Sequence, residues 1–161
     1  MTRRIFISYQ HDDQMQAKGF NLQGKNPNID FDFVGRHLLD PVDSENEGYI
    51  KSKIREQISG TSVTVVIIGK ETAYSEWVAW EIKESLEKEK PNGIVGVLLK
   101  DATPPPRDSP VGKALYEDGA EVVEWKQEEV EAAIERAAKA AGRVQQIRNS
   151  KNKGEESGCN R

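Results

Sequence analysis

Residues 62–68, SVTVVII, decide the fold of this chain. Their nearly continuous run of β-branched side chains predicts a strand buried on both faces, which is typical of a central strand in a parallel sheet. On either side, apolar runs at residues 4–9 and 94–99 predict two more buried strands. Residues 29–33 alternate apolar and acidic side chains, as an edge strand with one wet face does. A short strand is also expected near residues 121–124.

Helical periodicity fills the gaps between these strands. Ile50, Ile54 and Ile58 fall on one face of a helix and are expected to pack on the sheet. Further helices are predicted from about residue 76 to 88 and from about residue 128 to 141. Strands that alternate with helices indicate an α/β fold with a doubly wound parallel sheet. In such folds ligands bind at the carboxyl ends of the strands.

Composition limits the class of protein. The 161 residues fit one domain with short extensions, and the formal net charge of −4 argues against a general nucleic-acid or anionic-membrane binder. No stretch reaches the length of a membrane span, so a cytoplasmic location is expected. The one cysteine, Cys159, cannot form an internal disulfide, which suits a reducing compartment. His11 and His37 lack the spacing of a metal pair, and no metal site is predicted.

The segment from Ser75 to Glu81, SEWVAWE, can carry chemistry. Trp77 and Glu81 share a helix face, and Ser75 stands at the predicted helix start beside its exposed amides. A carboxylate beside an indole near a strand end suits a cationic, sugar-like transition state. An exposed helical glutamate with tryptophans packed on the sheet is the simpler alternative, and the spacing alone favours it.

The end of the first predicted strand is the second candidate site. Phe6, Ser8 and Tyr9 are followed closely by Asp12 and Asp13. A small hydroxyl and a tyrosine at a strand end can line a nucleotide pocket. The alternative is that Phe6 belongs to the core while one of the aspartates caps a helix. The spacing alone favours this alternative too.

In their order along the chain, these segments resemble the TIR superfamily. The resemblance lies in FISYxxxD at 6–13, TSVTVVIIG at 61–69 and TxxSxWVxxEI at 72–82. More narrowly, the chain is similar to the TIR-like proteins of bacterial Thoeris anti-phage systems, over about residues 3–141. The resemblance implies a flavodoxin-like (TIR-like) three-layer domain with a five-stranded parallel sheet in the order 2-1-3-4-5.

The same resemblance implies an activity. Many TIR proteins cleave the nicotinamide–ribose bond of NAD, and Thoeris-type members make a cyclic or otherwise modified ADP-ribose signal that activates a separate effector. It therefore implies an NAD+ nucleosidase or ADP-ribosyl cyclase in antiviral defence, with NAD as substrate and no cofactor. The family's catalytic glutamate matches Glu81. The matching substrate-binding positions are Phe6, Ser8, Tyr9, Ser75 and Trp77.

The partners follow from that activity. The resemblance implies an effector reached through a diffusible nucleotide, and it leaves room for a phage-derived activator and for homo-oligomers. It implies neither a nucleic acid nor a membrane partner.

A non-catalytic TIR-like sensor or scaffold, acting through protein–protein contacts, is the second interpretation. In it Glu81 is a surface or capping residue, and the acidic loop 40–47 contacts the partner. A receiver-like domain is a third interpretation, but Ser8 and Tyr9 stand where its acidic cluster would be. Mass spectrometry of the products formed from NAD separates the first interpretation from the second.

The TIR-like domain is expected to span residues 1–142, followed by a polar, disordered tail over residues 143–161. Deleting residues 145–161 is expected to leave the midpoint of thermal unfolding nearly unchanged, because the tail has no apolar stripe to dock. Thermal unfolding followed by circular dichroism measures this. A drop of many degrees would show that the tail packs on the domain.

Overall fold

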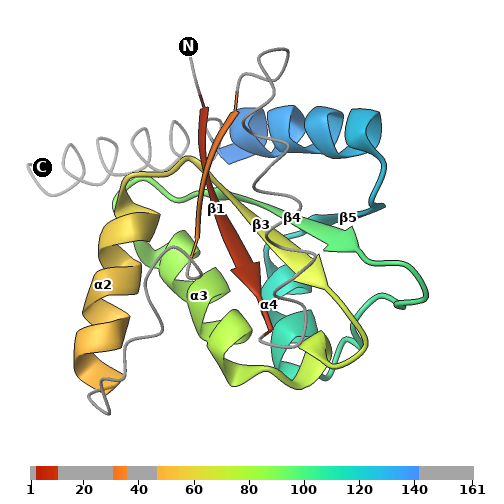
Figure 1. Cartoon of the computed structure of the whole chain (residues 1–161), viewed down its shortest axis with the longest axis horizontal. Coiled ribbons are helices and arrows are strands. Elements are labelled where there is room, and N and C mark those ends of the chain that lie inside the picture. Colours follow the sequence, from red (N-terminus) through yellow and green to blue (C-terminus); the bar gives the residue numbers. More distant parts are fainter. Residues whose placement is uncertain (1–2, 11–30, 36–46, 142–161) are drawn as a thin grey trace, which may run out of the picture.

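The structure, a computed structural model, describes residues 3–10, 31–35 and 47–141. Its strands form one sheet in the order β2-β1-β3-β4-β5, and every pair of neighbours is parallel (Figure 1). The strands are β1 (Arg3–Tyr9), β2 (Phe31–Gly35), β3 (Val63–Ile68), β4 (Gly93–Leu98) and β5 (Glu121–Glu124). This is the α/β fold with a parallel sheet that the sequence predicts, and it is compatible with a flavodoxin-like fold.

β3 is the central strand that its sequence predicts. All six of its residues are buried, and it lies between β1 and β4. Val65 stands opposite Ile7 on one side and Val95 on the other. β2 lies at the edge of the sheet, as its alternating pattern indicates, and it reaches Gly35 rather than ending at residue 33.

Helices cover both faces of this sheet (Figure 1). α2, α3 and α4 pack on one face, and a helix over residues 127–141, where the described residues end, packs on the other. The bounds are α2 (Glu47–Ser59), the short 3-10 helix η3 (Thr72–Tyr74), α3 (Glu76–Glu87) and α4 (Pro110–Glu117). The predicted tail, residues 143–161, lies outside the described residues.

α4 was not predicted from the sequence, in which Pro104, Pro105 and Pro106 come shortly before it and are typical of a loop. Its start is nevertheless well formed. The Ser109 hydroxyl accepts a hydrogen bond from the Gly112 amide at 3.0 Å, and Pro110 opens the helix where no amide is needed. Val111 and Leu115 then bury the inner face of the helix.

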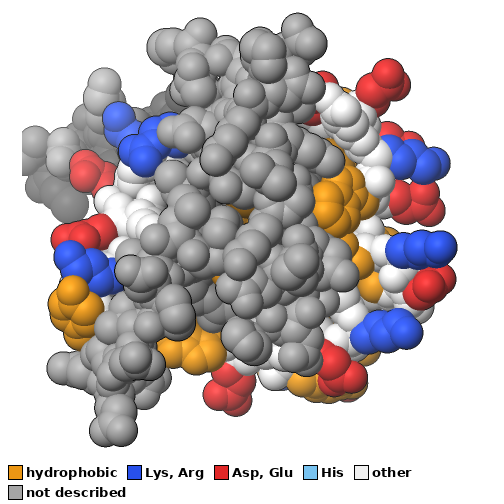
Figure 2. Space-filling model, viewed as in Figure 1, with side chains coloured by type: hydrophobic (Ala, Val, Ile, Leu, Met, Phe, Trp, Pro, Cys, Tyr) orange, Lys and Arg blue, Asp and Glu red, His pale blue; other side chains and the backbone are white. Residues whose placement is uncertain are grey.

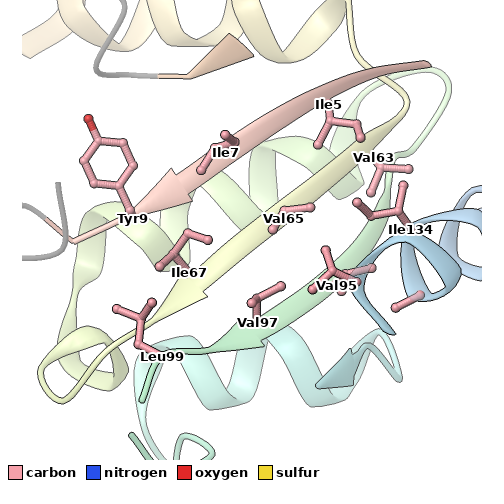
Figure 3. Close-up of a cluster of buried hydrophobic side chains, with 12 residues drawn as sticks. Ile5, Ile7, Tyr9, Val63, Val65, Ile67, Val95, Val97, Leu99 and Ile134 are labelled. Atoms are coloured by element: carbon pink, nitrogen blue, oxygen red, sulfur yellow. The ribbon is translucent and has the colours of Figure 1, made fainter. Parts of the chain in front are cut away.

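The two faces of the sheet hold separate cores. On one face, Ile7, Val65 and Val97 pack with Ile134 of the helix over residues 127–141, and the same cluster includes Tyr9 (Figure 3). Because side chains alternate along a strand, the next residues point to the opposite face. There, strand residues pack against α3 and α4, and a third cluster joins β1 to α2.

The third cluster confirms the predicted isoleucine stripe. Ile54 and Ile58 of α2 are buried against Phe6 of β1, and Ile50 packs at the margin of the same cluster. The apolar period of α2 therefore faces the sheet, while Arg55 and other charged residues face outward.

A buried polar network fastens α3 to β3. The Ser85 and Thr64 hydroxyls are 2.7 Å apart, and Ser85 also donates to the backbone carbonyl of Glu81 at 2.8 Å. The Asn92 amide donates to Thr61 at 2.9 Å and to Thr64 at 3.0 Å. Since buried polar groups are costly unless they are paired, this network fixes how α3 lies on the sheet.

Lys88, which follows the last residue of α3, joins this helix to α2. Its ammonium donates to the backbone carbonyls of Ile58 at 3.1 Å and of Thr61. Burial lowers the pKa of Lys88 from 10.5 to about 8. The folded chain therefore releases this proton near pH 8, whereas the unfolded chain keeps it up to about pH 10.5.

This difference predicts a pH dependence. Raising the pH from about 8 to 10.5 favours the folded state, because the unfolded state binds the extra proton across that window. Between pH 7 and pH 9.5, the free energy of unfolding of the wild type is expected to gain about 1 kcal/mol relative to Lys88→Met, since solvent screens a half-exposed group. Urea unfolding of both proteins at the two pH values measures this. If the free energy of unfolding differs between the wild type and Lys88→Met by the same amount at both pH values, the prediction is contradicted.

The surface of the described residues is mixed in charge. In Figure 2, Lys or Arg side chains lie among Asp or Glu side chains along the right-hand edge of the molecule. Within the residues that the structure describes, none of the helices has the length and apolar character needed to cross a membrane.

Candidate functional site

The site is built around Glu81, which α3 places against the sheet. α3 begins at Glu76 because the Ser75 hydroxyl accepts a hydrogen bond from the Val78 amide at 3.2 Å. Glu81 then falls on the buried side of the helix, close to Val78 and Ser85 in the helical period. Its side chain is fully buried.

Ser8 is a hydrogen-bond partner of this carboxylate. Its hydroxyl donates to Oε1 of Glu81 at 2.9 Å, and Ser8 is itself fully buried. Ser8 stands next to the last residue of β1 and opposite Val66 of β3. The structure thus places a serine and a glutamate together at the carboxyl end of β1, the edge where ligands bind in such sheets.

The exposed-glutamate interpretation is wrong. Glu81 is neither a surface residue nor a rim carboxylate, because the helical period carries it under α3 and onto β1. A buried carboxylate costs free energy unless hydrogen bonds compensate it, and a bond to a charged acceptor is among the stronger ones. The Ser8 hydroxyl supplies one such hydrogen bond to Glu81.

Phe6 lies on the same face of β1 as Ser8. It packs with Ile54 and Ile58 of α2, and Trp77 and Trp80 lie at the margin of that cluster. Three of the predicted residues, Phe6, Ser8 and Glu81, therefore share one side of the sheet, with Trp77 beside them on α3.

Tyr9 lies on the opposite side. Figure 3 shows its ring at the end of this cluster, beyond Ile7 and Ile67, with the hydroxyl directed away from them. The cause is the two-residue period of a strand, which sends neighbouring side chains to different faces. The structure therefore separates Tyr9 from Ser8 and Glu81, although the three were predicted as one site.

The two tryptophans of α3 form a rigid pair. Their ring centroids lie 5.6 Å apart with the planes at 89°, an edge-to-face arrangement. The Lys51 ammonium lies 5.8 Å from the Trp77 ring and 5.3 Å from the Trp80 ring. Arg55 also lies over Trp80, at 5.4 Å, and pairs with Glu84 at 3.2 Å. These contacts join α2 to α3 beside the site.

Lys51 and the contact between Ser8 and Glu81 are what sequence reasoning missed. The signal for the contact was present, since Ser8 is a hydroxyl within an apolar strand and Glu81 is a carboxylate within an apolar stripe. Buried polar groups need partners, so the two could have been matched. Among the described residues, there is no cluster of three or more histidine, cysteine, aspartate or glutamate side chains able to hold a metal ion.

A parallel α/β sheet, with a buried glutamate in the helix after its third strand, is the arrangement expected of a TIR-like domain. The family model described as "Thoeris protein ThsB, TIR-like domain" matches residues 6–104, more than half of the chain. The chain belongs to this family, and thereby to the proteins of Thoeris anti-phage defence. The matched range contains every predicted site residue. A comparison with curated proteins gives no match.

Proposed function

We propose that this chain is an NAD-processing enzyme of Thoeris defence, which cleaves NAD and makes a cyclic or modified ADP-ribose signal for an effector. The observation that carries the proposal is the buried contact between Ser8 and Glu81, at the carboxyl end of β1. Family membership supplies the reaction class. A carboxylate buried at such a cost suits a chemical role better than a structural one.

The reaction needs little acid catalysis. The bond between ribose C1′ and the nicotinamide nitrogen breaks, and its electron pair leaves with nicotinamide as a neutral base. The ribose is left as an oxocarbenium cation, which the Glu81 carboxylate stabilises across a low-dielectric site. Water then attacks C1′ and releases a proton, or an adenine nitrogen attacks and closes a cyclic product.

The remaining residues take supporting roles in this proposal. Ser8 holds the carboxylate in place through its hydroxyl. Trp77, one turn before Glu81, offers an indole to a ring of the substrate, and Ser75 fixes the start of the same helix. Phe6 forms the apolar floor, and Tyr9 contacts the substrate from the other side of the β1 end.

The burial of Glu81 adds a requirement. A fully buried carboxylate cannot touch a ribose, so substrate or an activator must uncover it first. The proposal therefore includes low activity of the isolated chain and stimulation by an activator. A phage protein and self-association are the two forms of activation to test.

The test is to incubate the full chain with NAD, with and without phage-infected cell extract, and to identify products by mass spectrometry. The expected result is nicotinamide together with a cyclic or modified ADP-ribose in the stimulated sample. A folded protein that stays inert with every activator, and under crowding that promotes oligomers, would overturn the proposal in favour of the scaffold. The loop proposed as the scaffold's partner surface lies, from residue 40 to 46, outside the described residues.

A further inference from the structure

A groove lies along α3, beside α2. It runs between α2, α3 and the first residue of α4, and its volume is about 410 Å³. Lys51, Trp77, Trp80 and Lys83 line it together with Glu76. Figure 2 shows hydrophobic surface near the lower edge of the molecule, between α2 and α3. The volume falls in the range of small-molecule sites, and Glu81 is absent from the lining residues.

The apolar wall of the groove is held in place from behind. Trp77 and Trp80 meet edge to face at 5.6 Å, and both pack on the cluster of Phe6, Ile54 and Ile58. Each indole is only partly buried, so part of each faces solvent. Because the sheet and α2 fix these rings, little conformational entropy is lost when a flat ligand settles on them.

The charge of the groove is opposite to that of the chain. Two lysines, Lys51 from α2 and Lys83 from α3, line it with one acid, Glu76. Arg55 adds a third cation over Trp80, although Glu84 neutralises it at 3.2 Å. The chain as a whole carries a formal charge of −4, whereas the lining of the groove holds more cations than acids, which favours an anionic ligand there.

We propose that this groove between α2 and α3 binds a nucleotide, with phosphate at Lys51 and Lys83 and the base against the tryptophan pair. Ammonium groups make strong, charge-assisted hydrogen bonds to phosphate oxygens. Bases of any identity gain from stacking on indole. An acidic peptide would use the lysines but not the aromatic wall, and a membrane surface would not fit a bounded hollow. The nucleotide uses both features.

This groove shares Trp77 with the proposed NAD site but not Glu81, which is buried and is not among the residues that line it. The probe is adenosine monophosphate, the smallest ligand with one base and one phosphate. Isothermal titration calorimetry of the full chain at physiological salt is expected to give saturable binding in the micromolar to low millimolar range. In a Trp125→Phe background, where only Trp77 and Trp80 emit, the same titration is expected to change tryptophan fluorescence.

Variants locate the binding. Lys51→Gln combined with Lys83→Gln is expected to weaken it at least tenfold. The matched control, Lys90→Gln with Lys139→Gln, changes two exposed lysines outside the groove and should leave it unchanged. Circular dichroism confirms that both double variants fold. Adenosine, which lacks the phosphate, should bind at least tenfold more weakly than the monophosphate.

Glu81→Gln should bind adenosine monophosphate as the wild type does. Loss of binding in that variant would place the nucleotide at the glutamate site and overturn the groove. Absence of saturable binding, or equal binding by the two lysine double variants, would overturn it as well. So would an acidic peptide or an anionic vesicle that occupies the groove where the monophosphate does not.

Discussion

Glu81→Gln is expected to lower the rate of NAD turnover by about a hundred- to a thousand-fold while the protein stays folded. The amide keeps the volume of the side chain and can still accept the Ser8 hydrogen bond through its oxygen. It removes the negative charge that faces the developing oxocarbenium. Losing one such contact costs about 3–4 kcal/mol in the transition state. The measurement is product formation by wild type and variant under the activating condition.

The burial of Glu81 changes what is expected of folding. A rim carboxylate would matter little to stability, whereas this one is fully buried, so its charge is costly to the folded state. Glu81→Gln should therefore keep or raise the midpoint of thermal unfolding. Glu84→Gln, the same change on the same helix at a partly exposed position, is the control and should retain full activity. Full activity in Glu81→Gln would show that another group carries the chemistry.

Gly93→Ala is expected to destabilise the domain by about 3 kcal/mol. A Cβ at Gly93 would lie inside contact distance of the Ala137 backbone carbonyl and 2.9 Å from the Ala137 Cβ. The helix over residues 127–141 would have to move off β4, which would open the core on that face. For a domain of this size, the midpoint of thermal unfolding should fall by about 6–12 °C. Differential scanning calorimetry measures the change.

Gly119→Ala provides the comparison. Gly119 has a φ of +73°, but a Cβ there would meet nothing within 4 Å. Only backbone strain then acts, and the expected cost is about 1 kcal/mol. If Gly93→Ala proves no more destabilising than Gly119→Ala, the close approach of Ala137 to β4 is contradicted.

Local pattern was enough for most of the fold. The β-branched run of β3 could only be a buried strand, and the isoleucine period of α2 could only face the sheet. α4 was missed because the prolines before it masked a sound helix start at Ser109. The Ser-Pro pair that opens α4 and the spacing of its apolar residues are both visible in the sequence. The helix could therefore have been predicted from them.

The site was harder to predict than the fold. Periodicity places Glu81 on a helix face, but only the tertiary structure shows which surface that face meets. Its partner Ser8 lies 73 residues away along the chain, so the contact could be found only by matching two isolated polar residues of apolar segments and not from a local pattern. The placement of Ser8 and Tyr9 on opposite faces of the sheet could be predicted, because adjacent residues of a strand point to opposite sides.

The separation of the β1 side chains between the two faces of the sheet has a use in protein engineering. Ile5, Ile7 and Tyr9 of β1 belong to the core under the helix over residues 127–141, whereas Phe6 and Ser8 contact α2 and α3. A combinatorial library that repacks Ile7, Val65 and Val97 at constant volume can therefore be screened for heat tolerance while the face that carries Ser8 and Glu81 is left unchanged. A second library, selected for altered reaction products, would vary residues on the other face of the sheet. Gains from the two screens should combine additively, since few side chains are shared between them.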